Sequence, residues 1–449
     1  MDKDEVLATC MKHNFWTWSA QNHAHPIAVE RAEGVYFWDM DGKRYLDFNS
    51  MVMCANVGHG EPRIRQAMIE QIETLTFAGP HMATLPRARI CQKLLEIVPA
   101  GLEKFLFTLG GADANENAVK LARGYTGKFK ILSQYRSYHG ATFGALALTG
   151  DPRRTSWEPG VMPGVVHFSG PYRYRSALHA SGEVISDEQL CRDYLHHLEN
   201  IIRFEGPETI AGILMESVTG TNGVLIPPDG YLAGVRALCD RYHICLILDE
   251  VMAGFGRTGK WFACQHWGVT PDIMTMAKGL TGAYAPLGAV AMKAEVAAAY
   301  NEKVYQGGLT FNGHPVSLAA AIATIQMMQD DHIVDRAAQT GQVFAQELKQ
   351  LMEKHPCIGE ARSIGLFGAI ELVKNRSSRE PLADYNASSP TIKTLVNDLE
   401  SAGLYIHAHW NVLLLIPPLI IRPEELREGF ALIDKALTKV DHEIVKLNM

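Results

Sequence analysis

Two apolar runs that each end on ionisable residues constrain this chain more than any other feature. Residues 244–248 are followed by Asp249 and Glu250, and residues 273–277 are followed by Lys278. A continuous apolar run of this length is typical of a strand that is buried on both faces. Ligands bind beyond the carboxyl ends of the strands in an open parallel sheet. We therefore expect the acid and the lysine to face one site.

The order of the predicted elements indicates an α/β fold. From residue 105 to about residue 320, β-type runs alternate with helical segments, which is the pattern of a parallel sheet. Strands are expected at residues 105–108, 130–133, 165–168, 212–215, 244–248, 273–277 and 288–292. The rest of the chain suggests a small α+β domain. The expected boundaries are residues 1–60 and 330–449 for the two parts of the small domain, and 61–329 for the large domain.

Composition and charge exclude several classes of protein. The net charge of −7 and the isoelectric point near 6.2 predict no basic surface for nucleic acid or anionic lipid. The eight cysteines include no C-x-x-C pair, which favours reduced thiols over a disulfide framework or a metal site. The N-terminus lacks the features of a secretory signal, and the apolar stretch 412–421 is too short to span a bilayer. We therefore expect a soluble cytoplasmic protein that binds no metal.

A pair of glycines between a predicted strand and a predicted helix is a candidate phosphate site. Gly110 and Gly111 follow the strand at 105–108, and the helix begins near Ala112. Glycine lets an anion approach the backbone, and a helix start supplies free N–H groups and a favourable dipole. The spacing matches neither G-x-G-x-x-G nor a P-loop, and Gly-Gly more often marks a tight turn. The motif alone supports phosphate binding only weakly.

Asp249 and Lys278 together suit pyridoxal phosphate (PLP). An anionic Asp249 would stabilise the protonated ring nitrogen, and Lys278 would form the covalent link to the cofactor and move the substrate proton. A lone lysine at a strand end is more often a solvated surface charge, but the strand before Lys278 is predicted to be buried. Val251 is expected to pack against the ring. Tyr138 is expected to stack on the ring, although the residue taken alone is more often an ordinary half-buried tyrosine.

Two other residues have two interpretations each. Glu216 ends the strand at 212–215, and either orients a neighbour in the site or lies at the rim of the sheet. Thr310 precedes a tight turn and a helix, and is either a phosphate ligand or a residue that stabilises the turn. The aromatic N-terminal cluster suits a satellite core or a subunit contact as well as a pocket wall. Candidates for the substrate pocket are aromatic, apolar or imidazole side chains: Trp16, Trp18, Met53, Phe77, Tyr138, His407 and Trp410.

Taken together, these motifs resemble the class III (subgroup II) PLP-dependent aminotransferases, the ω-amino acid and amine:pyruvate group. The resemblance runs from about residue 20 to the end, and is strongest to members called taurine–pyruvate aminotransferases. The matching blocks are residues 110–116, 138–140, 249–251, 254–259, 276–279, 310–315 and 417–419. The resemblance implies fold type I, with a mainly parallel seven-stranded sheet. It also implies a homodimer with active sites at the interface, either alone or paired into a tetramer.

The resemblance implies a role for each matched residue. Gly111 and Ala112 would meet the cofactor phosphate, Tyr138 would stack on the ring and His139 would contact the cofactor. Asp249 would pair with the ring nitrogen, Val251 would pack beside it and Lys278 would carry the covalent link. Glu216 would support the site, and Thr310 would reach the phosphate of the partner subunit's cofactor.

One departure from the family concerns the acid group of the substrate. Many ω-aminotransferases carry a mobile arginine in the segment that corresponds to residues 403–416, and this chain has none there. We expect His407, His409 or a more distant arginine to bind the carboxylate, or the carboxylate to bind less tightly. A bidentate arginine–carboxylate pair is hard to replace with one imidazole.

The sequence leaves the reaction partly open. The leading hypothesis is amino transfer from an ω-amine, taurine or β-alanine to a keto acid such as pyruvate by a ping-pong mechanism. The alternative is a PLP-dependent lyase or decarboxylase on the same fold. A non-catalytic protein is disfavoured by the intact Asp249 and Lys278. A nicotinamide dehydrogenase is disfavoured because no strand–G-x-G-x-x-G–helix unit is present.

Overall fold

A seven-stranded sheet forms the centre of the computed structural model, which describes residues 1–180 and 182–447. The strand order is β4-β10-β9-β8-β7-β5-β6, and β10 runs antiparallel to both of its neighbours. The strands are β4 (Leu102–Thr108), β5 (Lys130–Gln134), β6 (Val165–Phe168), β7 (Ile210–Glu216), β8 (Cys245–Asp249), β9 (Ile273–Met276) and β10 (Gly288–Lys293). The expected seven strands and the mainly parallel sheet are therefore confirmed, and β4 begins earlier than predicted.

Both faces of this sheet are buried, which explains the unbroken apolar runs. Along β8, Leu246 and Leu248 belong to one apolar cluster, and Ile247 belongs to another on the opposite face. Ala114 and Ala118 of α5 lie in the same cluster as Ile247, and their small side chains let that helix pack closely on the sheet. Successive side chains alternate between faces, so a strand covered on both sides has no polar position to spare.

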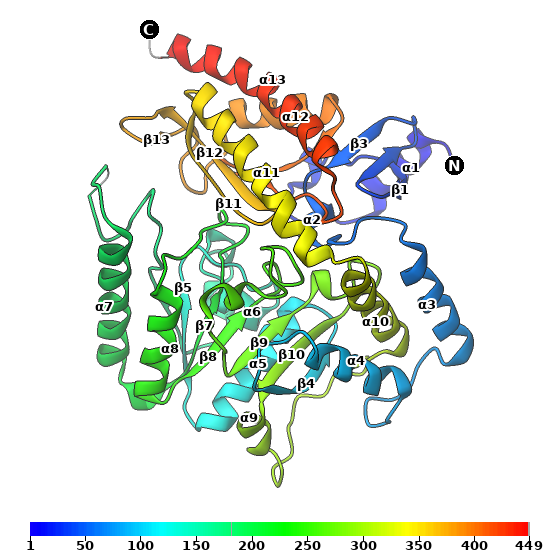
Figure 1. Ribbon diagram of the computed structural model, residues 1–449, viewed down its shortest axis with the longest axis vertical. Coiled ribbons are helices and arrows are strands. Elements are labelled where there is room, and N and C mark those ends of the chain that lie inside the picture. The colour runs from blue at the N-terminus through cyan, green and yellow to red at the C-terminus, as the bar shows by residue number, and fades with distance from the viewer. Residues whose placement is uncertain (181, 448–449) are drawn as a thin grey trace.

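Helices surround the sheet and continue above its carboxyl edge (Figure 1). Those of the central region are α3 (Pro62–Thr74), α4 (Leu85–Leu95), α5 (Gly111–Thr126), α6 (Phe143–Leu148), α7 (Asp187–Glu205), α8 (Tyr231–Tyr242), α9 (Ala294–Ala298) and α10 (Pro315–Asp330). The others are α1 (Lys3–His13), α2 (Ser50–Met53), α11 (Ile333–Lys354), α12 (Pro390–Ser401) and α13 (Pro423–Leu447). Within the described ranges, no helix is both long enough and apolar enough to cross a membrane.

The N-terminal and C-terminal segments of the chain both lie above the central sheet (Figure 1). β1 (Val29–Glu33), β2 (Tyr36–Asp39) and β3 (Arg44–Asp47) form a sheet with β14 (Leu404–Tyr405), in which Leu404 pairs with Leu46 in parallel. A second sheet contains β11 (Ile358–Ile364), β12 (Phe367–Asn375), β16 (Val412–Leu415) and β15 (His407–His409), with β13 (Glu380–Pro381) beside β12. The exact domain boundaries at residues 60 and 330 stay predictions.

The register of the central sheet sets Glu216, Asp249 and Thr275 at one level. Glu216 of β7 pairs with Asp249 of β8, and Asp249 pairs with Thr275 of β9. Lys278 follows β9 after one intervening residue, so it leaves the sheet at the same edge. Parallel strands present their carboxyl ends together, and this edge is where a ligand site is expected.

Candidate active site

A cavity of about 530 Å³ lies at the carboxyl edge of the sheet. Eight of the residues expected from the sequence line it together: Gly111, Ala112, Tyr138, His139, Glu216, Asp249, Val251 and Lys278. They come from positions that follow β4, β5, β7, β8 and β9 or end those strands. The sheet therefore places residues as far apart in the sequence as Gly111 and Lys278, which are 167 positions apart, around the same cavity.

Asp249 is a buried carboxylate held by a network of neighbours. Its Oδ2 accepts a hydrogen bond from Asn115 Nδ2 at 2.8 Å and lies 2.7 Å from His139 Nδ1. Its Oδ1 accepts from the backbone N–H of Val251 at 2.9 Å. Thr275 holds the amide of Asn115 in turn, with its hydroxyl donating to Oδ1 at 2.7 Å. These contacts orient the carboxylate and leave it suited to a positively charged partner in the cavity.

Glu216 has a different environment, although its strand position matches that of Asp249. It is buried at the cavity wall, and its two carboxyl oxygens accept from the backbone N–H groups of Tyr138 (3.0 Å) and Gly220 (2.6 Å). Burial raises the pKa of Glu216 to about 7, with His139 acting against the shift and Asp249 reinforcing it. A carboxyl group with this pKa can hold a proton at neutral pH.

Lys278 leaves the sheet in a constrained conformation. Its φ angle of 46° lies in the left-handed region. A Cβ atom at the next residue, Gly279, would come 2.5 Å from Asn56 Nδ2 and 2.8 Å from Phe255 Cβ, so only glycine fits there. The side chain of Lys278 lines the cavity and makes no hydrogen bond or ion pair with the residues that the structure describes. Its amine is therefore available to react.

The start of α5 forms the opposite part of the cavity wall. Gly110 precedes the helix and no side chain caps it, so the first N–H groups have no side-chain partner at the cap. A Cβ atom at Gly111 would come 2.9 Å from Val251 Cγ1, and one at Gly140 would come 2.5 Å from Ala112 Cβ. The glycines therefore let three segments approach closely around an uncapped helix start, which is an arrangement that suits a phosphate.

Comparisons with known proteins agree on one family. The sequence model of class III aminotransferases matches residues 18–437. Taurine–pyruvate aminotransferase of Bilophila wadsworthia is 32% identical over 98% of this chain and 99% of its own. The structure of taurine:2-oxoglutarate aminotransferase from Bifidobacterium kashiwanohense, in complex with PLP and glutamate, is similar with a TM-score of 0.95. It is 40% identical and covers 99% of each chain.

The chain belongs to the class III aminotransferases. A further similar structure is a thermostable (S)-enantioselective ω-transaminase from Thermomicrobium roseum, with a TM-score of 0.91 and 36% identity over 98% of this chain and 99% of that one. The family is PLP-dependent, so the chain is an enzyme that uses PLP and acts on a small amine and a keto acid.

The residues that line the cavity of this class III aminotransferase fit PLP, independently of the comparisons. The uncapped helix start suits the phosphate, the buried Asp249 suits a protonated ring nitrogen, and the free amine of Lys278 suits an aldehyde. His139 adds a further observation, because its buried Nε2 has no hydrogen-bond partner among the described residues. A buried polar atom of this kind is completed by a ligand or a water molecule.

Several expected residues do not line the cavity of this single chain. Trp16 is half-buried, and Trp18 is 71% exposed. Phe77 is 41% exposed and packs edge-to-face on Phe311, with ring centroids 5.7 Å apart. Thr310, beside Phe311, is exposed. The contacts of these four residues with the substrate or the cofactor therefore stay predictions.

Met53, His407 and Trp410 are also absent from the cavity lining, and His407 is exposed on β15. Met53 is buried beside the lining residue Cys54. The Trp410 ring packs on His409 with centroids 3.9 Å apart, and His409 Nδ1 lies 2.9 Å from the carbonyl oxygen of Thr221, which lines the cavity. The ring of His407 lies 6.3 Å from that of His409. The C-terminal segment therefore supports the wall rather than forming it in this chain.

The lining residues that the sequence reasoning missed include Asn115, Thr221 and Cys54. Asn115 carried a usable signal, because it follows Gly111 by four positions and so lies on the same face of the predicted helix. Cys54 follows a turn, Ser50–Met53, whose four residues have φ angles of 44° to 63°. Left-handed turns without glycine cost about 1–2 kcal/mol per residue, and no sequence pattern announces one.

Proposed function

We propose that this enzyme transfers an amino group from an ω-amine or ω-amino acid, such as taurine or β-alanine, to a keto acid such as pyruvate by a ping-pong mechanism. The observation that carries the proposal is the meeting of Asp249 and Lys278 at one cavity above the sheet edge. Support for the substrate class comes from the Bilophila and Bifidobacterium relatives, whose names specify taurine with pyruvate or 2-oxoglutarate.

The proposed roles of the catalytic residues follow from their contacts. Bound PLP supplies an electron sink for the bond broken at the substrate carbon. Asp249, held by Asn115 and His139, would keep the ring nitrogen protonated. Lys278 would hold PLP covalently, and its freed amine would then move a proton to and from the carbon that bears the amino group. Glu216 would hold a proton beside these groups.

The remaining contacts would position the cofactor. Gly111 and Ala112 would offer backbone N–H groups to the phosphate at the start of α5. Val251 and Tyr138 both line the cavity and would enclose the ring, Val251 by apolar contact and Tyr138 by stacking. His139 would reach the cofactor environment through Asp249.

A homodimer with active sites at the interface forms part of the proposal. Apolar side chains are exposed on α3, on α4, in the connection between these helices and in the connection before α10: Ile69, Ile72, Phe77, Leu85 and Phe311. Exposed apolar groups that gather in one region mark an interaction surface. Thr310 and Phe77 belong to this region, and each would complete the cavity of the partner subunit. Light scattering after gel filtration is expected to give a mass of two chains, or four if dimers pair.

An amine-donor panel tests the proposed reaction. Purified enzyme with PLP, pyruvate and each of taurine, β-alanine, putrescine and 1-phenylethylamine is expected to form alanine from at least one ω-amine. The carbonyl product should appear in equal amount. Release of carbon dioxide or sulfite without alanine would instead identify a lyase or decarboxylase. Alanine formation only from α-amino acids would contradict the ω-amine assignment.

A further inference from the structure

Arg153 lies directly behind two residues of the cavity wall. Its guanidinium carbon is 3.8 Å from the centroid of the Tyr138 ring, and its Nη2 donates to the Thr221 hydroxyl at 3.1 Å. Tyr138 and Thr221 both line the cavity. The positive charge is therefore one side chain away from the space that we assign to the substrate.

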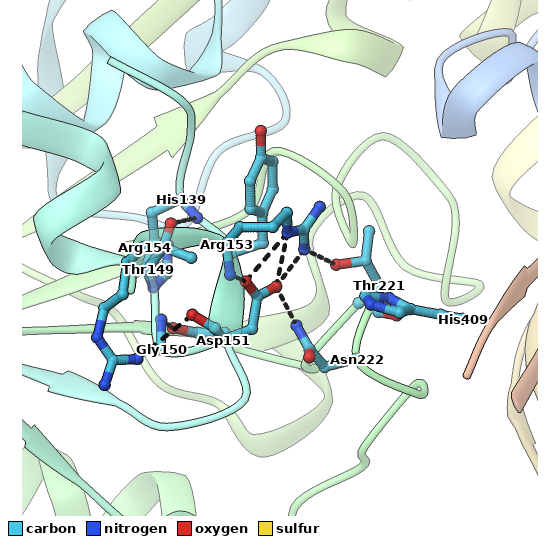
Figure 2. Close-up of polar contacts among 12 residues, drawn as sticks. His139, Thr149, Gly150, Asp151, Arg153, Arg154, Thr221, Asn222 and His409 are labelled. Atoms are coloured by element: carbon cyan, nitrogen blue, oxygen red, sulfur yellow. Dashed lines mark hydrogen bonds and ion pairs between the residues drawn. The ribbon is translucent and has the colours of Figure 1, made fainter. Parts of the chain in front are cut away.

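The side chain of Arg153 is held in place by the carboxylate of Asp151. The buried carboxylate of Asp151 accepts from its backbone N–H at 2.9 Å and from its Nε at 2.8 Å, and pairs with its Nη2. Asn222 Nδ2 donates to the same carboxylate at 3.1 Å. Figure 2 shows Asp151 between Asn222 and Arg153, and Thr221 beyond the guanidinium. This anchor fixes the direction of the arginine before any ligand arrives.

Arg153 has N–H donors that its contacts with Asp151 and Thr221 do not use. A guanidinium carries five N–H groups, and the contacts with Asp151 and Thr221 use those of Nε and Nη2. Nη1 makes no hydrogen bond with the described residues, and the side chain is 28% exposed. An anchored arginine with an open edge is suited to grip a planar acid group.

The neighbouring arginines, Arg154 and Arg136, do not combine a fixed guanidinium with contacts to two residues of the cavity wall. Arg154 extends away from Thr221 in Figure 2, and its Nε pairs with Glu158 at 3.1 Å. Arg136 lies against the rings of Tyr385 and Trp410, at 4.6 and 5.7 Å from their centroids. Arg153 thus stands out by its contact with two wall residues.

His409 of the C-terminal segment is poorly suited to bind an anion. Burial lowers the pKa of His409, and the charge of Arg153 lowers it further. A neutral imidazole at pH 7 has no charge to set against a carboxylate. His409 Nδ1 is also directed at the carbonyl oxygen of Thr221. The segment 403–416 therefore contains no arginine, and the histidine that contacts this wall, His409, is neutral at pH 7.

We propose that Arg153 determines specificity by binding the acid group, carboxylate or sulfonate, of the amine donor and of the keto acid acceptor. It would take the place of the arginine that is absent from residues 403–416. This inference rests on the proposed function for the identity of the substrates. Asp151 is then a positioning residue, which holds the guanidinium behind Tyr138 and Thr221 without touching the substrate.

Kinetics of paired acidic and neutral substrates test the inference. Arg153→Gln is expected to raise KM for pyruvate, β-alanine and taurine by roughly 10- to 100-fold, because a charge-assisted hydrogen bond is lost. KM for 1-phenylethylamine and for a neutral aldehyde acceptor should stay within about twofold, and kcat at saturating acid should change little. Arg153→Lys should recover part of the affinity, because it restores the charge without the fork.

Two further variants control for folding and for general loss of charge. Arg153→Gln leaves Asp151 as an unpaired buried charge, so the double variant with Asp151→Asn removes both charges together. The double variant should show the same selective loss for acidic substrates. The adjacent Arg154→Gln removes one positive charge away from the wall, and should leave KM for every substrate within about twofold.

A binding measurement separates this inference from the proposed function. Ethanesulfonate and propionate carry the acid group without an amine, and their binding to the PLP-loaded enzyme is measured by calorimetry. Weaker binding in Arg153→Gln by roughly tenfold supports the acid site, even if the wild-type enzyme forms no alanine. Equal binding in both proteins, or a KM increase that is the same for acidic and neutral substrates, would overturn the inference and leave the aminotransferase assignment intact.

Discussion

Glu216 and Asp249 pair across adjacent parallel strands, yet their carboxyl groups experience opposite environments. Asp249 accepts hydrogen bonds from a side chain and a backbone group and lies beside His139. Glu216 is enclosed with only two backbone N–H groups, and burial raises its pKa to about 7. One sheet edge therefore presents one acid suited to be an anion and one suited to hold a proton.

The raised pKa of Glu216 predicts a pH-dependent stability. Its folded pKa of about 7 lies above the ordinary value of 4.5, so the folded protein binds more protons than the unfolded chain between these values. Stability of the cofactor-free protein should therefore fall as pH rises from about 4.5 to 7, by roughly 3 kcal/mol from this group. Urea unfolding of the wild type and Glu216→Gln at pH 5 and pH 8 measures the change.

The change in the free energy of unfolding between the two pH values is more informative than its value at either pH. Glutamine lacks one acceptor, so Glu216→Gln loses a hydrogen bond, and this cost does not itself depend on pH. The loss of stability between pH 5 and pH 8 should be smaller in the variant than in the wild type. An equal loss in both proteins would show that Glu216 does not carry the raised pKa.

Substitution of Asp249 tests the anionic partner of the cofactor. Asp249→Asn keeps the size of the side chain but removes its charge, so the protonated ring nitrogen loses its stabilisation. We expect kcat to fall on the order of 10²–10³-fold. Steady-state kinetics with measured PLP content check this. The exposed Asp240 on α8 offers a matched control, and Asp240→Asn should keep kcat unchanged.

Lys278 is expected to be the residue that carries PLP. Borohydride treatment followed by peptide mass spectrometry should find the cofactor on Lys278 and on no other lysine. Lys278→Ala should lose this modification, and its turnover should fall roughly 10²–10⁴-fold, because the proton carrier is gone. Lys293 pairs with Asp272 at the far end of β10, so Lys293→Ala should keep both properties. Modification at another lysine in the wild type would refute the assignment.

Gly111 is predicted to control cofactor affinity. A methyl group at this position would come 2.9 Å from Val251 Cγ1 and push the start of α5 away from the ring site. We expect Gly111→Ala to raise the Kd for PLP by roughly 5- to 100-fold. Titration of cofactor-free protein with PLP gives this value. Gly160 has open space around it, so Gly160→Ala should bind PLP as the wild type does.

The local pattern of the sequence was sufficient to predict the strands and the ionisable residues that follow them. Buried strands need unbroken apolar runs, and Asp249 and Lys278 stand directly behind two such runs. The uncapped helix start at Gly111 followed from a glycine pair between a strand and a helix. Each of these features depends on neighbours in the chain, and the sequence alone determined the fold class and the cofactor.

Contacts between distant segments were decided only by the tertiary structure. Asn115 meets Asp249 because α5 packs on β8, and the residues are 134 positions apart. Arg153 reaches Thr221 because Asp151 anchors it, and no local pattern distinguishes it from Arg154. Side-chain partners across such separations depend on how the elements pack, which hydrophobic periodicity does not encode. The sequence therefore determined which cofactor this protein uses, while the packing of its loops decided which arginine contacts the cavity wall.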